Sequence, residues 1–490
     1  MSGAEARAKR IHPSDDVAVA LAPLSKGAQA LGVTALCDIP SGHKMALRAI
    51  RRGEDVIKYG MPIGRATEDI PLGAWVHTHN LTTKLDAERE YLYEPSHIPA
   101  IAPFEGSFMG YLRADGSVGI RNELWILPTV GCVNGAAEAI AYRARREAGV
   151  PVYAFCHPYG CSQLGEDHEN TQKTLARLAR HPNAGGVLVV GLGCENNHIA
   201  AFRAVLGPVD ERRVRFLNAQ DAEDEIEEGL RLVREIASVM RSDQRTAQGV
   251  SKLVLGLKCG GSDGLSGITA NPLLGAVSDG VCAAGGSALL TEVPEMLGAE
   301  TLLMNRCDGV ETFQSAADMV NGFKRYFASH GQPVYENPSP GNRAGGITTL
   351  EEKSLGCTQK GGTGPVSDVL GYAEARRKSG LTLVNAPGND ICAATALAAA
   401  GAQLVLFTTG RGTPLGAPVP TVKISSNAAL AAKKKNWIDF DASPLADGAE
   451  LADEARRLMR LVLDTASGAE TRNEQNGERQ IAIFKNGVTL

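Results

Sequence analysis

The stretch Ile120-Arg-Asn-Glu-Leu-Trp-Ile-Leu127, continued by Pro128-Thr-Val-Gly-Cys-Val-Asn134 and by the run from Gly135 to Arg146, decides the fold of this chain. It predicts a buried strand, a turn that contains glycine and a helix. The same succession follows at Val152-Tyr-Ala-Phe155, and a helix over about 171–181 leads into Gly186-Val-Leu-Val-Val-Gly191. Repetition of strand, turn and helix predicts a parallel α/β sheet, with functional loops at the carboxyl ends of its strands.

A further α/β block begins near Ser251 and extends to Leu490. Its signals are four strand-like runs and one helical run, at 253–257, 287–291, 381–384, 403–407 and 391–400. Residues 335–364 are rich in Gly, Pro, Asn and Thr. Loops of this length are uncommon in compact domains and are usually functional, so we expect this stretch to form a wall of the active site.

The N-terminal part has a different pattern. Short apolar runs punctuated by Gly and Pro between His12 and about Asn80 predict a small all-β module. The length of 490 residues agrees with about three domains. We therefore expect a multidomain α/β protein with a β domain at 1–85, a linker at 86–105, an α/β domain at 106–248 and a second α/β domain at 249–490.

Composition excludes several classes of protein. Hydrophobic residues make up 43%, charged residues 21%, and the net charge is -5, which argues against disorder and against nucleic acid as a partner. The charged N-terminus has no apolar segment behind it, and no later stretch is long and apolar enough to span a bilayer. We expect a cytoplasmic protein with no membrane partner. The ten cysteines stand singly in Gly-rich turns, so reduced thiols are expected, some of them ligands.

The segment Gly73-Ala-Trp-Val-His-Thr-His-Asn80 has two histidines two residues apart among strand-forming residues. On a strand, His77 and His79 would face the same way, and two neutral imidazoles on one face can bind a divalent metal. The alternative interpretation is a half-exposed strand whose histidines bond to neighbouring backbone.

Four cysteines lie beside glycine and polar groups near predicted strand ends: Cys161, Cys194, Cys259 and Cys357. Such turns suit thiolate ligation of a soft or borderline metal, including iron, although any one cysteine can instead be a small buried hydrophobe. No Cys-x-x-Cys is present, which argues against a zinc ribbon or a ferredoxin-type cluster, while three separated cysteines still permit an iron–sulfur cluster. Gly191-Leu-Gly lacks the third glycine of a dinucleotide fingerprint, so NAD binding is rejected.

Taken together, these motifs resemble the altronate and galactarate dehydratases. The resemblance runs from Ile11 to Leu490 and includes His77-Thr-His-Asn80, Tyr159-Gly-Cys-Ser-Gln-Leu-Gly165, Gly191-Leu-Gly-Cys-Glu-Asn-Asn197, Cys259-Gly-Gly-Ser-Asp263, Thr291-Glu-Val-Pro-Glu295, Leu355-Gly-Cys-Thr-Gln-Lys360 and Thr409-Gly-Arg-Gly-Thr-Pro414. It implies an N-terminal SAF (β-clip) domain, two α/β dehydratase domains and a hydro-lyase of hexuronate catabolism that dehydrates a sugar acid. The implied cofactor is Fe²⁺, with Mn²⁺ as a substitute and an iron–sulfur cluster still open.

The implied reaction converts D-altronate to 2-dehydro-3-deoxy-D-gluconate and water. Its difficulty is the removal of a proton from C2, beside a carboxylate that resists a second negative charge. A divalent metal on the carboxylate and a hydroxyl would stabilise the intermediate, while a general base takes the proton and a general acid assists loss of the C3 hydroxyl.

Site residues follow from the matched motifs. The metal is assigned first to His77 and His79, with Cys161, Cys194 and Cys259 as further ligands. The acid and base candidates are His157, Glu195, Asp263, Glu292 and Lys360, each of which has a structural alternative as a cap or a backbone acceptor. Arg121, Asn196 and Arg411 are the candidate substrate ligands; Arg411 is preferred of the two arginines, because its motif follows a strand.

Alternatives remain on the same fold. Galactarate dehydratase and sulfolactate sulfo-lyase keep the site and change the substrate, whereas a sugar-acid-binding protein would lack catalysis altogether. The expected partner is a small sugar acid, and a homo-oligomer is expected.

Overall fold

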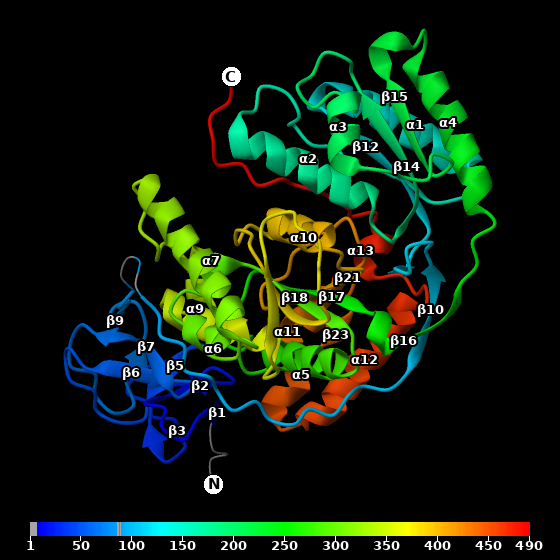
Figure 1. The fold of residues 1–490 in the computed structure, drawn as a ribbon. Helices are drawn as coiled ribbons and strands as arrows, with labels where there is room; N and C mark the ends of the chain where they lie inside the picture. Colours follow the sequence, from blue (N-terminus) through cyan, green and yellow to red (C-terminus); the bar gives the residue numbers. More distant parts are fainter. Residues whose placement is uncertain (1–6, 86–87, 89) are drawn as a thin grey trace.

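The computed structural model describes residues 7–85, 88 and 90–490 (Figure 1). Part of the expected linker, at residues 86, 87 and 89, lies outside the described residues, as does the charged N-terminal segment 1–6. No helix among the described residues is long and apolar enough to cross a bilayer.

The N-terminal domain consists of short antiparallel strands, which confirms the all-β prediction. The sheet orders are β1-β2-β5-β8, β6-β7-β9 and β3-β4. The strands are β1 (Ala8–Lys9), β2 (Val17–Ala20), β3 (Gln29–Ala30), β4 (Val33–Thr34), β5 (Lys44–Ala46), β6 (Asp55–Lys58), β7 (Met61–Ala66), β8 (Trp75–Val76) and β9 (Leu81–Thr82). The segment that follows is anchored to the rest of the chain, because Tyr93 Oη donates to the backbone oxygen of Cys307 at 2.6 Å.

The second domain has the predicted strand–turn–helix succession and a parallel sheet in the order β13-β12-β14-β15. Helices α1 and α4 pack on one face of this sheet, and α2 and α3 pack on the other. The elements are β12 (Glu123–Pro128), η1 (Gly131–Val133), α1 (Asn134–Glu147), β13 (Val152–Ala154), α2 (Gly165–Ala179), β14 (Ala184–Gly191), α3 (Ile199–Leu206), β15 (Val214–Asn218), η2 (Ala219–Asp221) and α4 (Glu225–Met240).

A small antiparallel sheet, not anticipated from the sequence, joins this domain to the next. Strands β10 (Ser107–Leu112), β11 (Val118–Gly119) and β16 (Thr246–Gly249) pair in the order β11-β10-β16. Because β10 precedes the domain and β16 follows it, the chain enters and leaves the second domain at adjacent positions.

The C-terminal domain is built on a parallel sheet in the order β19-β20-β18-β17-β21-β22-β23. Its elements are η3 (Val250–Lys252), β17 (Val254–Cys259), α5 (Ala270–Ala283), β18 (Ser287–Leu290), η4 (Val293–Glu295), α6 (Glu300–Met304), α7 (Val310–Ser329), α8 (Pro340–Ala344), α9 (Leu350–Cys357), η5 (Thr358–Gly361), β19 (Val366–Leu370), β20 (Gly380–Val384), α10 (Asp390–Ala399), β21 (Leu404–Thr409), β22 (Thr421–Ser425), α11 (Ala428–Lys433), β23 (Phe440–Asp441), η6 (Ser443–Asp447), α12 (Leu451–Ala466) and α13 (Arg472–Gln475).

The stretch 335–364 differs from the expected long loop. It contains α8, α9 and η5, and every residue of α9 is buried. Helix α9 packs against β7 of the N-terminal domain and against η4. The stretch does border the site described below, but it does so as packed helix.

The three domains share apolar cores. One cluster joins Trp125 and Phe155 of the second domain to Leu397 and Phe407 of the C-terminal domain, where α2 packs against α10. Figure 1 shows this stacking, with the N-terminal domain against another side of the C-terminal domain. The C-terminal domain is therefore contacted by both other domains.

Candidate active site

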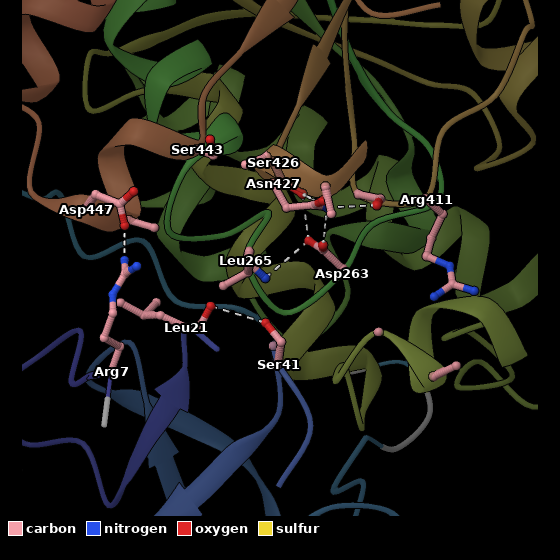
Figure 2. Close-up of a pocket in the computed structure, with 17 residues that line it drawn as sticks. Arg7, Leu21, Ser41, Asp263, Leu265, Arg411, Ser426, Asn427, Ser443 and Asp447 are labelled. Carbon is pink, nitrogen blue, oxygen red and sulfur yellow. Dashed lines mark hydrogen bonds and ion pairs between the residues drawn. The ribbon is translucent and has the colours of Figure 1, made fainter. Parts of the chain in front are cut away.

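The carboxyl edge of the C-terminal sheet faces the N-terminal domain across a polar cavity of about 400 Å³. The loops after β17, β21 and β22 bring Asp263, Arg411 and Asn427 to this cavity, and Arg7 and Ser41 line it from the N-terminal domain (Figure 2). Its volume lies in the range that small-molecule sites occupy. Ligand-binding loops at the carboxyl ends of parallel strands are what this architecture predicts.

Glycine permits the two domains to approach at this point. A Cβ on Gly264 would lie 1.9 Å from the backbone oxygen of Gly42, so any side chain there would force the domains apart. The backbone of the loop after β17 therefore lies directly against the turn before β5.

Asp263 is a fixed carboxylate at the base of the cavity. Its Oδ1 accepts from the hydroxyl of Ser426 at 2.8 Å and from the backbone N–H of Ser266 at 2.9 Å. Its Oδ2 accepts from Asn427 Nδ2 at 3.0 Å. These bonds join the loop after β17 to the loop after β22, as Figure 2 shows.

Of the two arginines predicted to bind substrate, Arg411 lies at the cavity and Arg121 does not. Within the described part of the chain, the Arg411 guanidinium has no hydrogen bond or ion pair, although it lines the cavity. Arg7, the other guanidinium of the cavity, is ion-paired with Asp447. The cavity thus presents one cation free to bind an anion.

Arg121 is instead held within the protein. It makes a two-pronged ion pair with Glu474, at 2.7 and 2.9 Å, and donates to the backbone oxygens of Thr465 and Ala469. These contacts join the start of β12 to the C-terminal segment after α12. The sequence predicts that Arg121 binds substrate, whereas these contacts are typical of a residue that holds two segments of the protein together.

A buried group of charges lies behind the loops after β17 and β18. Glu292 is ion-paired with Lys258 and lies 2.7 Å from Lys360 Nζ, and Lys258 also contacts Asp390 at 2.7 Å. Burial alone would lower the pKa of Lys258 and of Lys360, but the attraction of neighbouring acidic groups, Glu292 among them, outweighs burial and raises both. Glu292 holds this position with φ of 69°, a left-handed conformation that costs a non-glycine residue of order 1 kcal/mol or more and that clusters at functional sites.

Two cysteines and a glutamate complete this region. The Sγ atoms of Cys259 and Cys357 are 3.3 Å apart, and each lies 3.3 Å from Glu295 Oε2. Lys353 Nζ contacts the other oxygen of Glu295 at 2.8 Å. Burial alone would raise the pKa of Glu295, but Lys353 and Lys258 lower it. Among the described residues, these three side chains form the one group of His, Cys, Asp and Glu close enough to share a metal ion.

The histidines differ from the expected arrangement. Strand β8 ends at Val76, and His77 and His79 lie in the turn that follows, where Asn80 Oδ1 accepts from His77 N. The prediction that both project from one face of a strand is therefore wrong. His77 is buried and bonded to Thr348 Oγ1 at 2.9 Å, whereas His79 is exposed. Burial, Lys44 and His43 lower the pKa of His77 to about 4, so its ring is neutral at pH 7.

The remaining predicted residues belong to the second domain. His157 is buried with both ring nitrogens used, by the Pro128 oxygen and the Tyr159 N–H, and burial lowers its pKa. Asn196 Oδ1 accepts from Ser162 N, which holds the loop with Cys161 beside the loop with Cys194. Both of these cysteines are exposed.

Glu195 organises the loop after β14. It accepts from Thr129 Oγ1 and from the backbone N–H of Gly193, both at 2.6 Å. Burial alone would raise the pKa of Glu195, but these hydrogen bonds lower it. This pattern suits a structural carboxylate at least as well as a catalytic one.

The structure thus brings together only part of the predicted set. Asp263 and Arg411 both line the cavity. Cys259, Glu292 and Lys360 lie together in the buried group of charges beneath the loops after β17 and β18. Lys258, Glu295 and Lys353 were not predicted as site residues, and Cys357 was named among the cysteine turns suited to metal ligation without being assigned as a ligand. The signal for Glu295 and Cys357 was present, since both lie inside motifs that carried the family resemblance, but nothing in the sequence indicated that they touch.

Comparison with known proteins defines the class. Family models match all three domains: the altronate/galactarate dehydratase SAF domain over residues 6–84, the D-galactarate dehydratase/altronate hydrolase second domain over 110–241, and the D-galactarate/altronate dehydratase C-terminal domain over 250–489. The chain belongs to the altronate/galactarate dehydratase family, as the sequence predicted.

Curated relatives extend this result over the whole chain. The chain is 54% identical to altronate dehydratase of Escherichia coli (strain K12) and 51% identical to altronate dehydratase of Bacillus subtilis (strain 168), with 98% of this chain and 99% of each relative covered. It is 32% identical to galactarate dehydratase (L-threo-forming) of Escherichia coli (strain K12), over 97% of this chain and 96% of that protein.

Proposed function

We propose that this chain is an altronate dehydratase, a hydro-lyase that converts D-altronate to 2-dehydro-3-deoxy-D-gluconate and water. The observation that carries the proposal is identity above 50%, over nearly the full length, to two curated altronate dehydratases. The galactarate dehydratase relative is more distant, which makes galactarate the second candidate substrate.

The cavity supports a sugar acid with one carboxylate. Arg411 is its unpaired cation, because Arg7 is neutralised by Asp447. Ser41, Ser426 and Asn427 offer hydroxyl and amide groups to sugar hydroxyls. An aldarate would bring a second carboxylate for which the described lining of the cavity offers no free cation, and an unpaired buried charge is costly. This charge count favours altronate over galactarate.

We assign the chain's own groups to the steps as follows. Arg411 binds and orients the substrate carboxylate. Its positive charge stabilises the negative charge that develops when the C2 proton leaves. Asp263 lines the cavity and, unlike Asp447, has no ion-pair partner among the described residues; its Oδ2 accepts one hydrogen bond from them, from Asn427, so it retains capacity to take a proton. The pair formed by Glu292 and Lys360 behind the loop is the second candidate for proton transfer.

Ferrous iron is the proposed cofactor, with Mn²⁺ as a substitute. The two thiols and one carboxylate of Cys259, Cys357 and Glu295 are donors of the kind that Fe²⁺ binds, so the residues fit the ion. A bound divalent ion supplies Lewis-acid polarisation of oxygen ligands. The proposal also includes action in the cytoplasm as a homo-oligomer, which fractionation and sedimentation measurements will test.

The test is a comparison of kcat/KM for D-altronate and D-galactarate, under anaerobic conditions with ferrous iron. We expect D-altronate to yield a 2-keto-3-deoxy acid that carries one solvent-derived hydrogen at C3, because the enol left after loss of the C3 hydroxyl is protonated there. A preference for galactarate would change the substrate within the family. No turnover of either acid would favour a sugar-acid-binding protein.

A further inference from the structure

Three metal-binding atoms converge in the interior of the C-terminal domain. The sulfurs of Cys259 and Cys357 and one oxygen of Glu295 are each 3.3 Å from the other two, and the side chains are buried. They come from the end of β17, the end of α9 and η4, which are far apart in sequence. Two sulfurs bound tetrahedrally to one ion, at about 2.3 Å, are about 3.8 Å apart, so an ion requires a movement of only about half an ångström.

Ordinary packing does not account for this arrangement. A buried thiol usually packs as a small hydrophobe, yet here both sulfurs point at the same carboxylate oxygen. The other oxygen of Glu295 is held by Lys353 at 2.8 Å, and Asn337 also donates to it. Lys353 and Asn337 therefore orient Glu295 through the oxygen that does not face the sulfurs, as hydrogen-bond partners commonly do for ligating carboxylates.

Charge balance permits an ion whose thiol ligands are deprotonated. Lys258, Lys353 and Lys360 face the carboxylates of Glu292, Glu295 and Asp390, so the region is neutral when both thiols are protonated. A divalent ion that displaces the two thiol protons leaves this sum unchanged. The alternative, a divalent ion beside protonated thiols, would leave two positive charges buried without partners, which is strongly unfavourable.

We propose that Cys259, Cys357 and Glu295 bind one divalent transition-metal ion of borderline softness, such as Fe²⁺ or Zn²⁺. This inference rests on the proposed function in one respect: it takes the ion bound here to be the metal cofactor of the proposed dehydratase. A small cavity of about 10 Å³ is lined by Cys357 and Asp263, and Asp263 also lines the cavity proposed for the substrate, so the ion would lie close to the wall of that cavity. Of the five ligands expected from the sequence, only Cys259 belongs to this site.

The experiment is a titration of the chelator-treated full-length protein with Co²⁺, which reports thiolate ligation by a charge-transfer band in the near ultraviolet. We expect one equivalent to produce the band and to release two protons, measured with an indicator dye in weak buffer. Cys259→Ser and Cys357→Ser should each weaken Co²⁺ binding at least tenfold. Cys307→Ser is the matched control, because Cys307 is equally buried in the same domain and its sulfur contacts the Leu303 oxygen instead.

Glu295→Gln gives a second test should a serine variant fail to fold. It should keep the thiolate–cobalt band while weakening affinity, since it removes one ligand and leaves both sulfurs. Absence of the band in the wild-type protein, its survival in both serine variants, or recovery of the two cysteines as a disulfide would overturn the proposal. Metal binding without altronate turnover would defeat the proposed function alone, whereas altronate turnover by a protein that shows no thiolate–cobalt band would defeat this inference alone.

Discussion

Lys58 Nζ lies 2.7 Å from Glu352 Oε1, and this fully buried ion pair joins the N-terminal domain to α9. Lys44 Nζ contacts the second oxygen of Glu352 at 2.8 Å, so two lysines from strands of different sheets share one carboxylate. Burial alone would raise the pKa of Glu352, but Lys44 and Lys58 lower it to about 2. Burial also lowers the pKa of Lys44 to about 8. The contact between the N-terminal domain and α9 therefore depends on pH.

The first prediction is that the unfolding free energy of the protein falls in acid, because Glu352 becomes protonated. Its pKa is about 2 when folded and 4.5 as the ordinary value, so the unfolded chain takes up the proton first as pH falls. The stabilisation is complete above pH 4.5 and is lost between 4.5 and 2, by about 3 kcal/mol. Urea unfolding across this range should show the loss, and Glu352→Gln should flatten it. Glu169→Gln, at an exposed pair with Lys173, should leave the curve unchanged.

The second prediction concerns Arg411. Arg411→Ala should reduce kcat/KM for D-altronate at least tenfold, because the substrate carboxylate loses its free cation, and Arg411→Lys should recover part of it as a point charge. Steady-state kinetics measure this, with Arg456→Ala on the outer surface of α12 as the control. Wild-type kinetics in Arg411→Ala would remove this residue from the substrate site.

The third prediction separates two roles for Arg121. Arg121→Met removes one of the two guanidinium groups paired with the buried Glu474 and leaves Arg479 at 3.0 Å, so we expect a lower unfolding free energy, by less than the roughly 3–5 kcal/mol of a buried carboxylate with no partner. The kcat/KM of the folded fraction should stay near that of the wild type. Unchanged stability together with a raised KM would instead support the substrate-binding role expected from the sequence.

The fourth prediction concerns the histidines. His77→Gln should weaken the contact with Thr348 and lower stability, and His79→Ala, at an exposed position, should change stability little. Both proteins should keep their metal content by elemental analysis, since the thiolate site is intact in each. Loss of metal from either variant would restore the histidines as ligands.

The sequence predicted the architecture well because its signals are local. A strand, a glycine turn and a helix follow each other within about 30 residues, so β12 to β14 were found in order, as were β17, β18, β20 and β21, whereas β19 was not predicted. Helix α9 was missed for a physical reason. All of its residues are buried, including Glu352 and Lys353, so it lacks the polar face that makes a helical period visible in a sequence.

The site was predicted less completely because it depends on contacts between distant residues. Cys259 and Cys357 meet only because the strand order brings the ends of β17 and β18 together with α9. The two histidines were misjudged because Asn80 bonds locally to the backbone of His77, and such bonds compete with strand formation. The two-residue spacing of His77 and His79, on which the strand prediction rested, does not indicate whether such a local hydrogen bond forms.

The last prediction tests whether Glu292 and Lys360 act as one unit. Their ion pair is buried, and Glu292 keeps an unfavourable left-handed backbone to make it. Glu292→Gln should lower kcat by 10²-fold or more with a smaller change in KM, because the loss falls on proton transfer or on its electrostatic support. Lys360→Met should do the same.

The double variant should be little worse than either single variant, because each substitution already breaks the same pair. Unfolding free energies of all three proteins are measured in parallel, since an unpaired buried charge also costs stability. Glu300→Gln, at a buried carboxylate that accepts a hydrogen bond from Tyr91, is the control that should lower stability and leave kcat intact. Independent, multiplicative losses in the double variant would contradict a shared role and leave Asp263 as the proton acceptor to examine first.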